Sequence, residues 1–269
     1  MNELGLDGAL VAEWFQRRDS GSYVLIEIDA ELVNSWPRIL RDAVRRCYIA
    51  DSVVAAKARE HGVQQHEIVR SRLPDPGPTM AGDFGEILVF IYHSATALPV
   101  ELIGPKKWRL KQDRTKPAPY SDVVLLSVPH WPKPSEEDEI ICSEVKLKST
   151  DSDFAPITSA IAGSQKDRTS RLANTLVWLR DRALTEDLGS VRLVHLQRFI
   201  DATEHPPALK HYQAVAVICA SLARAELDAH RDPIPAGINL VVVVVPGLKA
   251  TYTAVYEAAQ LSLSSEGQP

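Results

Sequence analysis

The segment from Ile140 to Lys148 reads Ile-Ile-Cys-Ser-Glu-Val-Lys-Leu-Lys, and it constrains the fold more than any other part of the chain. Its branched apolar residues are typical of a strand buried inside a sheet. Successive side chains of a strand point to opposite faces, so Glu144 and Lys146 share one face while Val145 points to the other. An acid and a lysine at the end of a buried strand are costly unless they contact a partner or a ligand. The sequence therefore predicts a functional site at this end of the strand.

Asp122 opens an earlier apolar segment that ends at Val128. If the two segments are neighbouring strands, Asp122 and Glu144 come together beside Lys146. Mg²⁺ prefers oxygen ligands, and proteins usually bind it through one or two carboxylates. We therefore predict that Asp122, Glu144 and the backbone carbonyl of Val145 bind Mg²⁺, for which Mn²⁺ would substitute.

Phosphodiester hydrolysis is the reaction that such a site supports. The reaction needs a cation near the phosphoryl oxygens, an activated water and a stabilised leaving oxygen. Lys146 is predicted to orient or deprotonate the attacking water, with its pKa lowered by a neighbouring cation and by partial burial. Glu86, on a helix before the strands, is predicted as a further catalytic acid that binds a second ion or holds a water. The glycines beside Glu86 would let that helix approach the sheet closely.

Basic residues gather just before Asp122, with Trp108 and Tyr120 interleaved among them. Cations contact phosphates and aromatic rings stack on bases, so we expect a hairpin that follows a nucleic-acid backbone. The alternative is a solvated sheet edge whose charges block strand aggregation. No base-reading element is evident, and little sequence specificity is expected. The predicted nucleic-acid contacts are Lys106, Lys107, Arg109 and Lys111 in this cluster, and Gln165 and Lys166 on a later helix.

The order of the predicted elements indicates an α/β fold. A Pro/Gly-rich stretch over residues 73–78 divides the chain into an N-terminal α/β extension (1–75) and a main domain (76–269). The main domain has the order α-β-β-β-α-β and then one more strand and helix, which predicts a mixed sheet flanked by helices. The predicted elements are a strand over 23–28, a helix with Ser35 as its N-cap, a helix over 82–97, strands over 100–110, 122–128 and 140–147, a helix over 157–184, a strand over 211–218 that could also be helical, a strand over 238–245 and a helix over 250–261.

Composition sets outer limits on the class of protein. The net charge of -5 argues against a general nucleic-acid coat and leaves room for a local basic patch. The three cysteines are well separated, which fits neither a disulfide framework nor a zinc site. The longest apolar run, over residues 240–246, is too short to span a bilayer, and the first residues lack the parts of a secretion signal. We expect a protein of the reducing cytoplasm that does not bind membranes.

Glu86, Asp122 and Glu144-Val145-Lys146, in this order of elements, resemble the PD-(D/E)xK superfamily, which has the restriction-endonuclease fold. Ser121 stands where the superfamily usually has a proline, which lowers the specificity of the motif. The resemblance implies that Asp122 and Glu144 are the metal acids, that Lys146 is the catalytic lysine and that Glu86 is the helical glutamate. It covers roughly residues 82–217.

A narrower resemblance rests on the segments Gly82–Glu86, Ser121–Asp122 and Ser143–Lys146 in a chain of this length. They are similar to the HamA family, the nuclease subunits of Hachiman anti-phage defence. This resemblance implies a helicase partner of the HamB type, restraint of the nuclease in the resting complex, and degradation of DNA on infection.

Other functions stay open at this point. One is a restriction-like or repair nuclease with a different partner, and another is a catalytically silent subunit that binds nucleic acid as a scaffold. The intact Glu144 and Lys146 favour an enzyme, although a Glu-x-Lys pair on a strand is by itself more often a surface ion pair. The sequence does not distinguish DNA from RNA or single from double strands. We also predict that the segment up to Leu73 contacts a partner, because it adds nothing to the predicted site.

Overall fold

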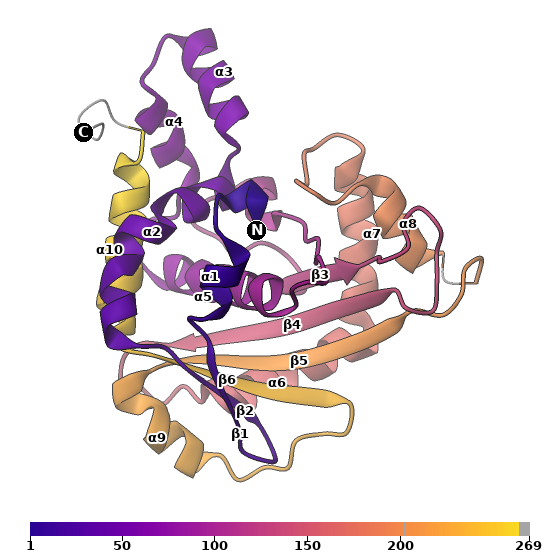
Figure 1. Cartoon of the computed structure of the whole chain (residues 1–269). Helices are drawn as coiled ribbons and strands as arrows, with labels where there is room; N and C mark the ends of the chain where they lie inside the picture. The colour runs from indigo at the N-terminus through magenta and orange to yellow at the C-terminus, as the bar shows by residue number, and fades with distance from the viewer. Residues whose placement is uncertain (202, 264–269) are drawn as a thin grey trace.

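A six-stranded mixed sheet runs through the computed structural model, which describes residues 1–201 and 203–263 (Figure 1). The strand order is β1-β2-β6-β5-β4-β3. Strands β2, β6, β5 and β4 are parallel to their neighbours in that series, while the edge strands β1 and β3 are antiparallel to theirs. The strands are β1 (Gln16–Asp19), β2 (Val24–Glu27), β3 (Val123–Ser127), β4 (Glu139–Lys148), β5 (Leu209–Cys219) and β6 (Ile238–Val245).

Helices cover both faces of the sheet, which confirms the predicted α/β fold. The α-helices are α1 (Gly8–Ala12), α2 (Ala30–Tyr48), α3 (Asp51–His61), α4 (Gln65–Arg72), α5 (Pro78–Thr96), α6 (Pro156–Lys166), α7 (Leu172–Ala183), α8 (Leu193–Ile200), α9 (Ala220–Ala229) and α10 (Leu248–Leu261). Two 3₁₀ helices, η1 (Asn2–Leu4) and η2 (Lys107–Leu110), and a π-helical turn, η3 (Asp167–Arg171), complete the set. Helices α3 and α4 project from the body at the top of Figure 1.

The two faces of the central strands belong to different hydrophobic cores. Val145 and Val215 lie on one face, in a core that includes residues of α2, α5 and α10. Cys142 lies on the other face and packs with residues of α7, and Ala216 packs there with residues of α6. Strands covered on both faces read as continuous apolar runs, which explains the valines of β6.

Several predicted elements are confirmed. The strand over 238–245 is β6, the strand over 140–147 is the centre of β4, and the segment over 211–218 is strand β5 rather than a helix. The helix over 82–97 is α5, which begins four residues earlier at Pro78. The long helix over 157–184 forms as α6, η3 and α7 in direct succession.

The strand over 100–110, and with it the three-strand meander, is wrong. Only one bridge joins this segment to β3, between Ile103 and Leu126, and residues 107–110 form η2 instead. Pro105 has no N–H to continue a ladder. The N-cap at Ser35 is also wrong, because α2 begins at Ala30 and the carboxylate of Asp29 accepts the first backbone N–H groups.

The N-terminal segment is part of the same sheet and core as the rest of the chain. Strand β2 pairs with β6, and α2 packs against α10. The boundary predicted near residue 75 falls in the connection between α4 and α5, and the division into two domains stays a prediction. None of the helices in residues 1–201 and 203–263 has the length and apolarity needed to cross a membrane.

Candidate functional site

One cavity of about 460 Å³ brings together the side chains predicted to be catalytic. Glu86 comes from α5, Asp122 from the residue before β3, and Glu144 and Lys146 from β4. The antiparallel register of β3 and β4 pairs Val123 with Ser143, so Asp122 lies beside Glu144 at the start of β3. This is the convergence that the sequence pattern predicts.

The ammonium group of Lys146 lies among the three oxygens predicted as metal ligands. Its Nζ is 2.6 Å from Oε1 of Glu144, 3.7 Å from Oδ2 of Asp122 and 3.3 Å from the carbonyl oxygen of Val145. A cation therefore already fits at the point where these oxygens converge.

Two carboxylates and one carbonyl oxygen form the possible donor set, and the binding of Mg²⁺ there stays a prediction. Residues 1–201 and 203–263 contain no group of three or more His, Cys, Asp and Glu side chains arranged to hold a metal. Asp122 and Glu144 with one carbonyl would leave most coordination positions to water and substrate, which is how Mg²⁺ is usually bound.

Asp122 is held in place by the backbone of the neighbouring strand. Its Oδ2 accepts a hydrogen bond of 2.9 Å from the N–H of Val145. This bond fixes one carboxylate oxygen at the edge of the cavity, where the side chain is 14% exposed. Asp122 is therefore positioned by the fold without a further ligand.

Glu144 is almost fully buried because α6 passes directly over it. Gly163 of α6 lies so close that a Cβ there would overlap the carboxylate of Glu144. Burial, and then the negative charge of Asp122, raise the pKa of Glu144 to about 7, although Lys146 opposes this shift. A carboxyl with this pKa exchanges its proton near neutral pH.

Arg171 is a member of the site that the sequence patterns did not single out. Its guanidinium forms an ion pair with Oε2 of Glu144 and donates to Oδ1 of Asp167 and to the carbonyl oxygen of Gly163. It lies at the end of the π-helical turn η3 between α6 and α7. The spacing of four residues between Asp167 and Arg171 indicates an ion pair along a helix, and the sequence carries this signal. The contact of Arg171 with β4 depends on the π turn, which the sequence does not indicate.

The lowered pKa of Lys146 was predicted for a site that holds a cation, and it stays a prediction. Burial lowers this pKa, but the charges of Asp122 and Glu144 outweigh burial and raise it above its usual value. Lys146 is therefore an ammonium at neutral pH and acts as a donor.

Glu86 lies deep in the cavity and is held by aromatic and basic partners. Its Oε2 accepts a hydrogen bond of 3.1 Å from Nε1 of Trp108 and lies 3.3 Å from Nζ of Lys107. Burial outweighs the attraction of Lys107 and, with the charges of Asp122 and Asp83, raises the pKa of Glu86 to about 8. The protonated form of Glu86 is therefore more favoured than in a free glutamate, although Lys107 opposes this.

The hairpin predicted before Asp122 does not form, and the four basic side chains predicted there as nucleic-acid contacts are not exposed, whereas those of Arg114 and Lys116 are. The four basic side chains are buried and each has an acidic partner far away in sequence. The ion pairs are Lys106 with Glu3, Lys107 with Glu86, Arg109 with Glu3 and Asp187, and Lys111 with Asp83. The predicted contacts Gln165 and Lys166 are exposed at the end of α6, and their role stays a prediction.

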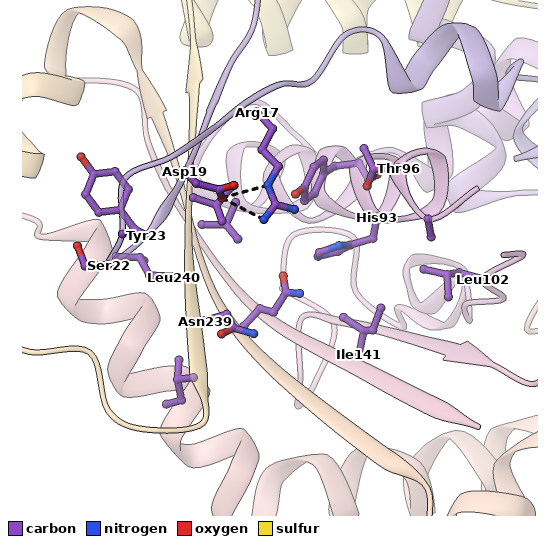
Figure 2. A pocket seen from close by; sticks show the side chains of 17 residues that line it. Arg17, Asp19, Ser22, Tyr23, His93, Thr96, Leu102, Ile141, Asn239 and Leu240 are labelled. Carbon is purple, nitrogen blue, oxygen red and sulfur yellow. Dashed lines mark hydrogen bonds and ion pairs between the residues drawn. The ribbon is translucent and has the colours of Figure 1, made fainter. Parts of the chain in front are cut away.

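A second, larger cavity of about 530 Å³ lies near the starts of β4, β5 and β6 (Figure 2). Asp19 is the one carboxylate among the described residues that line it, and Arg17 pairs with it at 3.0 Å. Burial lowers the pKa of His93 to about 4, so its ring is neutral, and it hydrogen-bonds the hydroxyl of Ser143. Without a second acid, this cavity offers no comparable metal site.

Comparison with known families places the chain in one family. The model of the HamA family matches residues 13–259, a range that includes Glu86, Asp122, Glu144 and Lys146. A search among curated proteins finds no match. The family resemblance predicted from short motifs is confirmed, while the wider PD-(D/E)xK assignment stays a prediction. The chain belongs to the HamA family.

Proposed function

We propose that this protein is a Mg²⁺-dependent nuclease that cleaves phosphodiester bonds of DNA. The observation that carries the proposal is the convergence of Asp122, Glu144 and the Val145 carbonyl on one cation, the ammonium of Lys146. Membership of the HamA family supports a role in Hachiman anti-phage defence.

The side chains of the cavity have distinct roles in this proposal. Asp122 and Glu144, with the carbonyl of Val145, would hold Mg²⁺, which when bound neutralises phosphoryl charge and lowers the pKa of water. Lys146 donates hydrogen bonds and positive charge to the phosphate or to the attacking water, as its raised pKa favours. Glu86 faces the same cavity and would hold a water or a second ion.

Regulation by a helicase partner of the HamB type is also a proposal. Both oxygens of Glu144 are in ion pairs, Oε1 with Lys146 and Oε2 with Arg171. Because both oxygens of this carboxylate are already paired, the contacts support a resting state in which a trigger is needed before Glu144 binds a metal. The same observation favours the second candidate, a nucleic-acid-binding scaffold without cleavage.

The predicted partner surface in residues 1–73 is best tested without truncation. Deletion of this segment would remove β2 from its pairing with β6 and α2 from the core. Substitutions on the exposed faces of α3 and α4 would leave the sheet intact, and loss of the assembly would support the predicted surface.

The proposed activity is tested by incubating the full chain with DNA in Mg²⁺ or in EDTA, with and without a HamB-type helicase. Cleavage is expected in Mg²⁺ and Mn²⁺, and EDTA should abolish it, because the two carboxylates cannot neutralise phosphate without a cation. Cleavage that persists in EDTA would contradict the metal role. DNA binding without cleavage in every condition, helicase included, would favour the scaffold.

The affinity for Mn²⁺ is expected to rise with pH until about pH 7 and then to level off. Glu144 must lose its proton to bind an ion, and burial and Asp122 raise its pKa to about 7. Below that pH, each unit should lower the affinity by about tenfold, because the ionised fraction of Glu144 falls by that factor. Calorimetric titration with Mn²⁺ across this range measures the profile, and an affinity that is flat or rises toward acid pH would contradict it.

A further inference from the structure

Two exposed aromatic side chains line the cavity that contains the acids. Tyr120 is 44% exposed and Phe154 is 40% exposed, and both line the cavity with Asp122 and Glu144. By contrast, Trp108, which the sequence also suggested for stacking, is 2% exposed and packed in the core. Exposed rings beside a phosphate-cleaving site offer surfaces for nucleobases.

The backbone holds Tyr120 in an unusual conformation. Its φ is +67°, and it is the one non-glycine residue with positive φ in the part of the chain that the structure describes. Such a conformation costs about 1–2 kcal/mol for a residue with a Cβ. The next residue, Ser121, is anchored through its N–H to Thr175 Oγ1 at 3.1 Å and through its hydroxyl to Asp167 at 2.7 Å. The fold thus stabilises a strained backbone that leaves the tyrosine ring partly exposed, with the ring of Trp178 at 6.0 Å between centroids.

Topology brings Phe154 to the same end of the sheet. It lies between β4 and α6, just past the strand that carries Glu144, while Tyr120 lies just before the antiparallel β3. Lys148 at the end of β4 donates a hydrogen bond of 2.6 Å to the carbonyl of Ser152, which holds this connection against the strand. The two rings therefore border the cavity from the segments that flank the acids on both strands.

We infer that the cavity takes an unpaired DNA strand whose bases stack on Tyr120 and Phe154 while its backbone lies at Asp122 and Glu144. This inference rests on the proposed nuclease function and adds the form of its substrate. Bases inside a duplex are already stacked on each other, so the rings can engage only bases that are unpaired. Lys146 and Arg171, which line the same cavity, supply positive charge for the phosphates.

Binding without cleavage is the direct test. The full chain is titrated into three labelled DNAs: an oligothymidine strand, its duplex, and a strand of abasic sugars. Ca²⁺ replaces Mg²⁺, so that a divalent cation is present beside the two carboxylates. Tyr120→Asn removes a ring and tolerates positive φ, and Phe154→Leu removes a ring and keeps apolar volume. Each should weaken binding of the oligothymidine strand by about tenfold, the loss of one stacked base, and leave duplex and abasic DNA unaffected.

Matched variants separate stacking from structure. Tyr120→Phe and Phe154→Tyr keep the rings and should bind the oligothymidine strand like the natural chain. Tyr23→Leu removes a ring that lines the other cavity and should have no effect. Circular dichroism confirms that each variant folds. Loss of binding in Tyr120→Phe as large as in Tyr120→Asn would overturn the inference.

The remaining outcomes distinguish this inference from the proposed function. Oligothymidine binding that is insensitive to both ring removals, or equal losses on abasic DNA, overturns the inference even if the chain cleaves DNA. Ring-dependent binding of the unpaired strand supports the inference, and it does so even if Mg²⁺ produces no cleavage, a result that counts against the nuclease alone.

Discussion

Glu144→Gln is expected to lower Mg²⁺-dependent DNA cleavage by about a thousandfold or more, because it removes one of the two charges that hold the ion. The amide keeps the shape of the side chain under Gly163, so the fold should be preserved. Lys146→Ala should cause a loss of similar size, since it removes the one ammonium that contacts both Asp122 and Glu144. Cleavage rates with saturating DNA, measured against Mg²⁺ concentration, check both variants.

Glu139→Gln is the matched control for this prediction. Glu139 lies at the other end of β4, where it pairs with His211 at 3.5 Å on the surface. The same loss of charge there should leave cleavage unchanged. If Glu144→Gln or Lys146→Ala cleaved DNA as fast as the natural chain, the site would not lie in this cavity.

Gly163→Ala is expected to lower cleavage by about a hundredfold while the protein stays folded. The added methyl group would overlap the carboxylate and the Cγ of Glu144, so this side chain must move. A displacement of about 1 Å in a catalytic group costs about a hundredfold in rate. Alanine also favours a helix over glycine by about 1 kcal/mol, which offsets part of the crowding.

Gly82→Ala is the matched control, because it makes the same substitution at a position where no atom would overlap the added methyl group. Gly82 is also a helical glycine at the edge of the cavity, and a Cβ there meets nothing within 4 Å. Thermal unfolding and cleavage should both stay close to those of the natural chain. Full activity in Gly163→Ala would mean that the position of the Glu144 carboxylate is not critical. Unfolding of Gly163→Ala would mean that the crowding is relieved by the backbone.

The buried strands were predictable from the sequence because their apolar runs carry the signal directly. The alternation of side chains along β4 was sufficient to assign Glu144 and Lys146 to one face of the sheet. Asp122 was predicted beside them because it stands at the start of β3. Strand β1 was missed, because its residues Gln16–Asp19 are all exposed and show no apolar pattern. The pairing of β2 with β6 joins residues more than two hundred positions apart, and local patterns carry no information on such contacts.

The basic cluster shows why charge alone is an ambiguous signal. Lys111 and Lys107 looked like a phosphate-binding face because their acidic partners, Asp83 and Glu86, belong to another element. A buried lysine is stable only with such a partner, and the pairing is decided by packing rather than by neighbours in sequence. Arg171 escaped prediction for the same reason, since its contact with Glu144 crosses from the π turn to β4.

The most direct measurement of the central claim is a crystal structure of the full chain soaked with Mn²⁺, with anomalous scattering used to locate the ion. We expect one strong peak in contact with the carboxylates of Asp122 and Glu144, and displacement of the Lys146 ammonium from between them. A peak elsewhere in the molecule, or none beside these two acids at saturating Mn²⁺, would contradict it.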